Sequence, residues 1–364
     1  MKFFHASAII FLLTATSIRA QIADPVLMCQ LPSVLNESSG VETSNANSVW
    51  THNDSGDSAR IFNIDTTGNI LRIVFFIVDT AFDCEESTRD ANGNYYLGDF
   101  GNNLNNRTNL RIYKIPNPDT LSVDTIIPQI IFFRYPDQTL FPPDSALWNF
   151  DCEAMFHFQN SLYLFSKNRG TSTYSRMYRL PDQPGDYVAE LVDSFNTGTW
   201  ITSGDINPAG NMMILLSESR IWLFTGFTGT DFFGGNAQMI QMYTTQKEAV
   251  VFASDSTVYI TDEYFLGTGG KLYRLDLRSW INGIHEDVSS TVFTMFPNPA
   301  TEKISVCIPE QGNDFLISIF DNTGKMVRQC SNCREIDVST LQKGHYFLHC
   351  FYGKTFLSGK FEKL

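Results

Sequence analysis

The sequence predicts an all-β protein, and three observations support this fold class. Runs of aromatic and β-branched residues recur along the chain, 13% of the residues are aromatic, and helical periodicity is weak. A motif also recurs, in which a basic residue precedes an aliphatic residue or methionine and then an aromatic residue. Its five copies are Arg60-Ile61-Phe62, Arg111-Ile112-Tyr113, Arg176-Met177-Tyr178, Arg220-Ile221-Trp222 and Lys271-Leu272-Tyr273.

The spacing of the motif identifies the repeat. The copies stand 51, 65, 44 and 51 residues apart. A period of about fifty is longer than that of most solenoids and is typical of the blades of a β-propeller. The unit around Arg111 contains four strand-like runs, which is the content of one blade. The sequence therefore predicts a five-bladed β-propeller. Six blades stay open, because the insertion between Ile115 and Phe150 is long enough to hold an irregular blade.

The ends of the propeller follow from its last unit. That unit lacks a fourth strand, whereas a spare apolar run stands at residues 26–31. We expect this run to pair with the last blade and to close the ring, because closure removes an open sheet edge. The propeller then spans residues 21–284, with a linker at 285–292 and a second domain at 293–364.

The first twenty residues are typical of a secretory signal peptide. Lys2 supplies a positive charge, residues 6–15 are apolar, and the segment ends on the small residue Ala20. The apolar run is too short to span a bilayer, and no later run is long enough. We expect a mature protein outside the cytoplasm with no transmembrane span.

The charge of the chain narrows the class of partner. The formal net charge is −13, and the first twenty residues contribute +2 through Lys2 and Arg19. Residues 293–364 carry eight basic and seven acidic residues, so residues 21–292 carry −16. This acidity argues against nucleic acid, whose phosphates need a basic surface. It permits metal cations or cationic partners, and an acidic surface that only keeps the protein soluble explains it equally well.

Four of the five units open on a glutamate. These residues stand 23, 26, 23 and 23 residues before the motif, whereas the fourth unit has Thr202 and Asp205 in this region. The four glutamates are Glu37, Glu85, Glu153 and Glu248. If they open the innermost strands, all four meet at one mouth of the central channel.

Polar residues that close the second strands should support these glutamates. Reflecting the second hairpin about its turn places Glu85 beside Asp99. The same operation and the neighbouring loops predict a ligand-binding mouth made of Asn53, Asp54, Asp99, Asn102, Asn168, Asp262 and Glu263.

Converging carboxylates repel one another, and a hard cation with oxygen ligands relieves this repulsion. Calcium suits such a set, so Glu37, Glu85, Glu153 and Glu248 are candidate metal ligands. The alternative is that each glutamate caps the backbone of the neighbouring blade, as a repeated packing device.

Signals of catalysis are weak. The chain has no Gly-x-Ser-x-Gly, no His-Glu-x-x-His and no phosphate-binding glycine loop. His52 and Asp99 are the weak catalytic candidates near the mouth. A lone histidine at a strand end is more often a hydrogen-bonding structural residue.

The C-terminal segment changes character. Alternating apolar runs separated by turns predict a small Ig-like β-sandwich over residues 293–364. Four elements stand out: a Pro-Asn-Pro opening, an Asp-x-x-Gly-Lys turn, a Leu-x-x-Gly-x-Tyr segment and a lysine in the last strand. Their marker residues are Pro297, Asn298, Pro299, Gly324, Lys325, Gly344, Tyr346 and Lys360.

This segment resembles the C-terminal sorting domain of type IX (Por) secretion substrates of the Bacteroidota. The resemblance implies export through the inner membrane, passage across the outer membrane by the type IX machinery, and a secreted or cell-surface location. In that family the tail is usually removed, and the cargo is released or attached to surface lipopolysaccharide.

Three functions are compatible with this sequence. The first is a β-propeller that binds a ligand or partner at its acidic mouth without chemistry. The second is a calcium-dependent hydrolase of lactone, ester or phosphoester substrates that uses the same mouth. The third is an adhesion or scaffold module, which is favoured if side chains plug the mouth.

Overall fold

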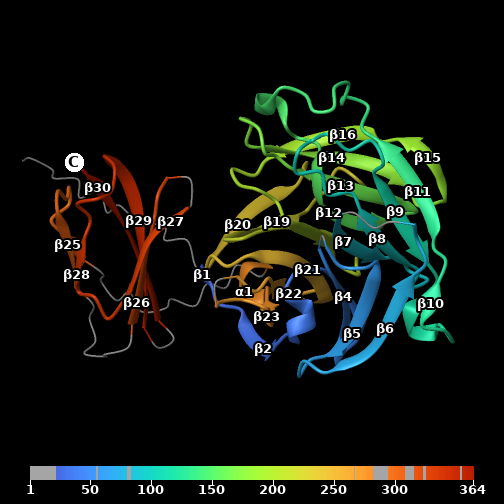
Figure 1. The fold of residues 1–364 in the computed structure, drawn as a ribbon, viewed down its shortest axis with the longest axis horizontal. Helices are drawn as coiled ribbons and strands as arrows, with labels where there is room; N and C mark the ends of the chain where they lie inside the picture. The colour runs from blue at the N-terminus through green and yellow to red at the C-terminus, as the bar shows by residue number, and fades with distance from the viewer. Residues whose placement is uncertain are drawn as a thin grey trace, which may run out of the picture. The chain divides into compact units, whose positions relative to one another are not determined.

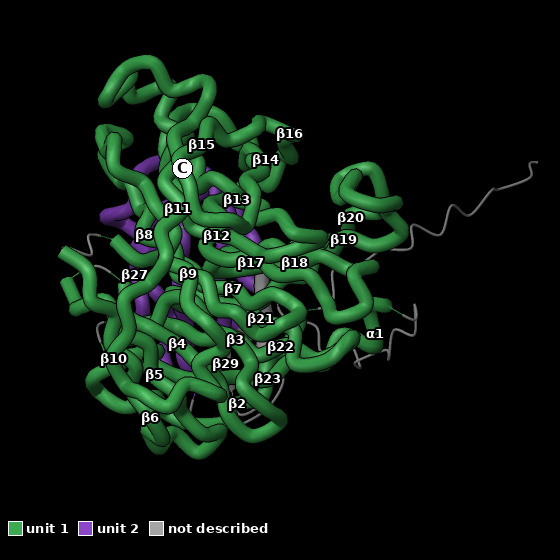
Figure 2. Tube along the Cα trace, turned by 90° about the vertical axis from the view of Figure 1, so that its right-hand side faces the viewer, with its two compact units in different colours: residues 1–284 green, residues 285–364 purple. Residues whose placement is uncertain are grey.

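The structure is a computed structural model that describes residues 22–54, 56–79, 83–265, 267–281, 294–307, 315–322, 325–352 and 355–364. The chain divides into two compact units, residues 1–284 and 285–364, coloured separately in Figure 2. The signal peptide expected at residues 1–20 and the linker expected at 285–292 lie outside the described residues.

Unit 1 is a β-propeller, as the sequence predicts (Figure 1). Its described residues form five sheets, here called blades 1 to 5, each with four antiparallel strands in meander order. The innermost strands are β3 (Ser38–Asn45), β7 (Cys84–Arg89), β12 (Asp151–Phe158), β17 (Ser203–Ile206) and β21 (Lys247–Ser254). These strands pack in that cyclic order, and β21 returns to β3, so the ring is closed.

The outer strands complete each blade. In blade 1 they are β4 (Ser48–Asn53), β5 (Arg60–Asp65) and β6 (Ile70–Phe76), and in blade 2 they are β8 (Tyr95–Asp99), β9 (Arg111–Ile115) and β11 (Gln129–Arg134). In blade 3 they are β13 (Ser161–Lys167), β14 (Tyr174–Pro181) and β16 (Glu190–Asn196), and in blade 4 they are β18 (Met212–Ser217), β19 (Arg220–Thr225) and β20 (Asn236–Met242).

Blade 5 closes the ring with strands from both ends of unit 1. After β22 (Thr257–Asp262) and β23 (Lys271–Asp276), the outermost strand is β2 (Val26–Gln30), which pairs antiparallel with β23. The prediction that the N-terminal apolar run completes the last blade is confirmed. Short elements complete the unit: the 3₁₀ turns η1 (Ser33–Leu35), η2 (Pro118–Thr120) and η3 (Ser145–Leu147), and α1 (Arg278–Ile281).

The recurring motif lies on the third strand of every blade. Its middle residue is at most 1% exposed in all five copies, because it packs into the core between neighbouring blades. The basic residue anchors nearby loops in several blades: Arg60 pairs with Asp57 at 2.8 Å, and Arg176 pairs with Asp137 at 2.8 Å. The motif is therefore a packing and anchoring device, which explains its regular recurrence.

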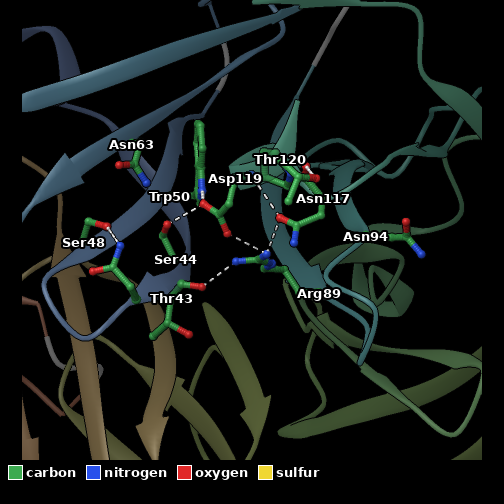
Figure 3. A network of polar contacts seen from close by, with 12 residues as sticks. Thr43, Ser44, Ser48, Trp50, Asn63, Arg89, Asn94, Asn117, Asp119 and Thr120 are labelled. Carbon is green, nitrogen blue, oxygen red and sulfur yellow. Dashed lines mark hydrogen bonds and ion pairs between the residues drawn. The ribbon is translucent and has the colours of Figure 1, made fainter. Parts of the chain in front are cut away.

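The insertion between Ile115 and Phe150 forms no sheet of its own. It supplies β11, the short strand β10 (Thr125–Ile126) that lies parallel to β6, and η2. Figure 3 shows how residues of η2 link blades 1 and 2: Arg89 Nη2 donates to Asp119 Oδ2 at 2.9 Å, and Trp50 Nε1 donates to Asp119 Oδ1 at 2.7 Å. The insertion thus ties two blades together.

Unit 2 is a two-sheet β-sandwich. One sheet contains β24 (Thr294–Phe296), β25 (Lys303–Cys307) and β28 (Glu335–Asp337). The other contains β26 (Phe315–Phe320), β27 (Met326–Ser331), β29 (Gly344–Tyr352) and β30 (Thr355–Lys363). Buried residues of both sheets, such as Ile304 and Leu348, form its core.

The sorting-motif residues hold the end of the chain in this sandwich. Asn298 Nδ2 donates to Lys360 O at 3.0 Å, and Asn298 Oδ1 accepts from Glu362 N at 3.0 Å. Tyr346 stacks on Phe361 with ring centroids 5.5 Å apart. Gly324 lies outside the described residues. Among the helices that the structure describes, none is long and apolar enough to span a membrane.

Candidate functional site at the acidic mouth

We use the word mouth for the end of the ring at which the inner strands begin. A β-bulge recurs there on three inner strands, because the pairing register shifts between Cys84 and Glu86, between Cys152 and Ala154, and between Lys247 and Ala249.

The residues inside these bulges are Glu85, Glu153 and Glu248. A bulge inserts one extra residue and redirects its side chain. Cys84, not Glu85, therefore pairs with Asp99, which differs from the simple hairpin reflection of the sequence.

Glu37 does not share this position. It precedes β3 and is exposed, and Ser39 and Gly40 lie in the irregular register of blade 1 instead. Glu37 lies near enough to Glu263 for its charge to raise the pKa of that residue. The structure thus places three of the four predicted glutamates in equivalent bulges and the fourth on the rim.

Two groups of three carboxylates meet at Glu85. Each residue of a group offers an oxygen within 4.8 Å of the others. The first group is Asp54, Asp83 and Glu85, and the second is Glu85, Asp151 and Glu153. Asp83 and Asp151 were not among the predicted ligands, although the repeated triplets Asp83-Cys84-Glu85 and Asp151-Cys152-Glu153 are a signal that could have identified them.

The chain neutralises the Asp151–Glu153 side with its own cations. Arg169 pairs with Asp151, and its Nη2 lies 3.1 Å from Glu153 Oε1. Lys167 Nζ lies 3.1 Å from Glu153 Oε2. Burial alone would lower the pKa of Lys167, but the carboxylates of Glu153 and Glu248 raise it above its usual range. This half of the mouth is internally compensated.

The Glu85 carboxylate, which both groups share, is not paired in this way. Glu85 is 4% exposed, and no described residue donates a hydrogen bond or forms an ion pair with its carboxylate. Burial, together with four neighbouring carboxylates, raises the pKa of Glu85 well above its usual range. Burial and the charges of Asp54 and Asp151 raise the pKa of Asp83 to about 7.

Gly101 makes room for this group. A Cβ atom at Gly101 would collide with the carboxylates of Glu85 and Asp83. The nearby Arg107 does not pair with Glu85: its guanidinium donates to Gly101 O at 2.7 Å and to Asp99 Oδ1 at 2.7 Å. The close approach of a glycine therefore lets two carboxylates face each other in a buried position.

Two further acids belong to the mouth. Burial raises the pKa of Glu248 to about 7, with Lys167 opposing this and Glu218 adding to it. Burial and the charge of Glu248 raise the pKa of Glu263 to about 8. Glu263 Oε2 accepts from Gln246 Nε2 at 3.1 Å. The acidic character of the mouth thus extends to blade 5.

Asp99 and Asp262 serve as anchors within their blades. Both are completely buried at the ends of second strands. Asp99 Oδ2 accepts from Arg111 Nε and Tyr113 OH, each at 3.0 Å. Asp262 Oδ2 accepts from Tyr273 OH at 3.0 Å. These bonds join the aspartates to the recurring motif, so the two residues lie behind the mouth and do not face it.

The three asparagines predicted to bind ligand are engaged with the chain. Asn53 Nδ2 donates to Val34 O at 2.7 Å, and Asn102 Nδ2 donates to Phe150 O at 3.0 Å. Asn168 Nδ2 donates to Tyr174 O at 3.0 Å. Their amides therefore support loops around the mouth.

His52 is buried below the mouth. It is 1% exposed, and its Nε2 accepts from the backbone N–H of Gly40 at 3.0 Å. Burial lowers the pKa of His52 to about 4, so the imidazole is neutral at pH 7. Its acceptor nitrogen is occupied by the backbone, which leaves it no lone pair for accepting a proton from a ligand.

A side chain crosses the ring axis deeper inside. Glu86 on β7 accepts from Ser203 Oγ and lies 3.4 Å from Gly204 N on β17. Blades 2 and 4 are not neighbours in the ring, because β12 lies between β7 and β17. Glu86 therefore bridges the axis, and burial raises its pKa well above the usual range. We call this contact the Glu86 bridge.

Exposed aromatic residues accompany the acids of the mouth. Trp200 is 48% exposed, and the cationic groups of Lys167 and Arg169 lie 5.9 and 5.3 Å from its ring centroid. Tyr264 and Phe265 follow Glu263 directly and are also exposed. No sequence pattern marks these residues, because single exposed aromatics do not recur with the repeat.

Comparison with known proteins identifies the tail. Residues 294–361 match the model of the secretion system C-terminal sorting domain. The predicted resemblance is confirmed, and the chain carries a tail that directs export by type IX secretion to the cell surface or beyond. No curated protein matches the chain.

Two solved structures show distant likenesses to the chain. The extracellular domain of a putative hybrid two-component system of B. thetaiotaomicron is 10% identical, with a TM-score of 0.33, over 95% of this chain and 60% of that chain. The WD40 repeats of RRP9 are 10% identical, with a TM-score of 0.35, over 66% of this chain and 67% of that chain. The chain spans about 60% of the length of the B. thetaiotaomicron domain.

Proposed function

We propose that this cargo of type IX secretion is a binding module whose mouth holds a divalent cation and docks a ligand without changing it chemically. The observation that carries this proposal is the Glu85 carboxylate, which is 4% exposed and lacks a donor or counter-ion among the described residues. An uncompensated buried charge is costly, so a cation that binds there is strongly favoured.

Calcium is the cation that suits this donor set best. Asp54, Asp83 and Glu85 offer only oxygen ligands, which hard cations prefer. Calcium takes about six to eight oxygen atoms, so three carboxylates leave positions for water and for an oxygen of the ligand. The proposed ligands differ from the predicted set, because Glu153 is occupied by Lys167 and Arg169.

Binding without chemistry is supported by the state of the two catalytic candidates. His52 is buried and already accepts a backbone hydrogen bond. Asp99 is completely buried and paired with Arg107 and Arg111. Neither group is placed to transfer a proton at the mouth. Trp200, Tyr264 and Phe265 offer exposed apolar contact area beside the acids, which favours a docking surface.

The location of this module follows from its tail. The sorting domain supports export to the surface or the medium, where millimolar calcium sites are common in extracellular modules. Attachment of the exported cargo to surface lipopolysaccharide stays a prediction. It is tested by extracting the native protein from cells and measuring whether its mass includes the polysaccharide.

Isothermal titration of the purified chain with calcium chloride tests the cation. We expect one site whose affinity falls on the order of 100-fold, or about 2.7 kcal/mol, in Glu85→Gln. Asp186→Asn is the matched control, because Asp186 is an exposed acid on the outer edge of blade 2. No binding by the unaltered chain overturns the cation site. Chelator-sensitive turnover of lactone, ester or phosphoester substrates would instead favour the hydrolase.

A further inference from the structure

Three blades carry a fifth strand at their outer edge. β10 lies beside β6 of blade 1, β15 (Gly185–Val188) lies beside β11 of blade 2, and β1 (Ile22–Ala23) lies beside β20 of blade 4. All three added strands run parallel to the fourth strand that they cover. The chain thus uses one repeated solution to cover its outer edges.

Blade 3 lacks this cover in the part of the chain that the structure describes. Its outermost strand, β16, pairs with β14 on one side only. Six of the seven residues of β16 are exposed, and the seventh, Phe195, is half-buried. An uncovered edge presents unpaired backbone donors and acceptors, which another extended chain can pair with. β2 is the other outermost strand without a described fifth strand, but it has only five residues.

A groove adjoins this open edge. It has a volume of about 460 Å³, and its lining includes Tyr174, Arg176, Leu191, Val192 and Asp193. Leu191 and Val192 are 44% and 39% exposed, so the groove offers apolar contact beside the backbone of β16. A recognition site of this kind gains affinity from main-chain hydrogen bonds and specificity from a side-chain pocket.

The charged residues near the groove indicate which charge a partner segment should carry. Glu190 is paired with Arg179, whose Nε lies 2.9 Å from Glu190 Oε2. Arg176 is paired with Asp137 at 2.8 Å. Asp193 forms no ion pair with a described residue, and its Oδ1 accepts a hydrogen bond from the backbone N–H of its neighbour Ser194 at 2.7 Å. The uncompensated charge at this edge is therefore negative, and it complements a basic side chain.

We propose that β16 is a docking edge for an extended segment of another protein, which adds as a parallel fifth strand to blade 3. The segment alternates apolar residues with a basic residue that reaches Asp193. The parallel direction follows from the three fifth strands that the chain itself supplies. This edge is independent of the mouth, because blade 3 carries it on its outermost strand and the mouth lies at the inner strands.

Hydrogen exchange of the full chain tests this docking edge. The probe is an eight-residue peptide that alternates valine with threonine and lysine, added at millimolar concentration. We expect the amides of residues 190–196 to exchange at least ~10-fold more slowly with the peptide, whereas those of 236–242 stay unchanged. The control peptide has the same sequence with alternate amides methylated, which removes the donors that pair with a strand.

Variants separate the charge from the backbone. Asp193→Lys should reduce the protection, and Asp186→Lys, a matched exposed acid on β15, should not. Unchanged exchange of residues 190–196 with the valine peptide overturns the proposal, as does equal protection by the methylated peptide. Protection that appears without peptide and grows with chain concentration would identify a second copy as the occupant, which also contradicts it.

Discussion

The two halves of the mouth contain similar acids but differ in how their charge is balanced. Asp151 and Glu153 face Arg169 and Lys167 of the same chain. Asp54 and Asp83 share Glu85 with them, yet no described residue donates a hydrogen bond to the Glu85 carboxylate or forms an ion pair with it. The two cations beside Asp151 and Glu153 show that the chain balances buried acids with its own residues where the fold brings such acids together. The Glu85 carboxylate therefore points to a cation from outside.

The largest loss of stability should follow from removing Arg169, one of the two cations beside Asp151 and Glu153. Arg169→Met removes the ion-pair partner of Asp151 and one of the two partners of Glu153, which are 0% and 3% exposed. Breaking a buried ion pair by removing one partner costs about 3–5 kcal/mol. Urea denaturation should show this loss in the free energy of unfolding. Arg179→Met is the control, since its exposed pair with Glu190 is worth about 0–1 kcal/mol. Equal losses in both variants would contradict the compensation of this half.

A substitution at Glu85 should change the free energy of unfolding in the opposite direction. Glu85→Gln removes a buried charge without a donor, so in the presence of a chelator it should raise the free energy of unfolding by about 1–3 kcal/mol. The same variant should lose the stabilisation that calcium gives to the unaltered chain. Thermal unfolding with chelator and with calcium measures both effects. A destabilised Glu85→Gln under chelator would show that the carboxylate has a structural partner.

The raised pKa values of three acids at the mouth predict how the free energy of unfolding depends on pH. Asp83 and Glu248 have pKa values raised to about 7, and that of Glu263 is raised to about 8. A raised pKa gives stability that is fully present below the unfolded value of about 4 and is lost as pH rises through the folded value.

With a chelator present, the free energy of unfolding should therefore fall from about pH 4 to about pH 8 and level off above these folded values. Calcium should weaken this decline, because it balances the ionised acids. Urea midpoints across this range provide the measurement. A flat profile with chelator would mean that these acids are compensated in the protein.

The smallest effect concerns the Glu86 bridge. Burial raises the pKa of Glu86 well above its usual range, and glutamine keeps an acceptor oxygen for Ser203 Oγ, so Glu86→Gln should cost less than about 1 kcal/mol. Glu86→Ala removes the contact to Ser203 and should cost about 1–3 kcal/mol. Comparing the two urea midpoints tests the bridge. A large loss in Glu86→Gln would show that the bridge is ionised and belongs with the charged mouth.

Much of the fold could be predicted because it is encoded locally. The motif around Arg111 and Tyr113 recurs at the blade period, and it recurs because each third strand buries an aliphatic residue between blades. The closing strand at Val26 was predictable for the same reason, since the last unit lacked one strand. The tail was identified from its motifs, and residues 294–361 match the model of the secretion system C-terminal sorting domain.

The candidate site was less predictable, because its geometry depends on strand register. A hairpin reflection placed Glu85 beside Asp99, but the bulge between Cys84 and Glu86 moves Asp99 to Cys84. Asp99 then turns to Arg111 and Tyr113, and Glu85 turns to Asp54 and Asp83. A register shift of one residue moves a side chain to the other face of the sheet, and no local sequence pattern predicts such a shift.

The sequence by itself determined the repeat, the acidic balance and the export tail, because each depends on residues close together in the chain or on composition. It also predicted the closure of the ring, because the last unit lacks one strand and a spare strand stands at the start of the chain. Only the tertiary structure decided which acids meet, which of them have cations of their own, and which blade edge stays uncovered. Those outcomes depend on contacts between segments of different blades, such as Asp54 with Glu85 in neighbouring blades and Glu86 with Ser203 across the ring. Charge balance in a buried site is therefore a property of the assembled ring.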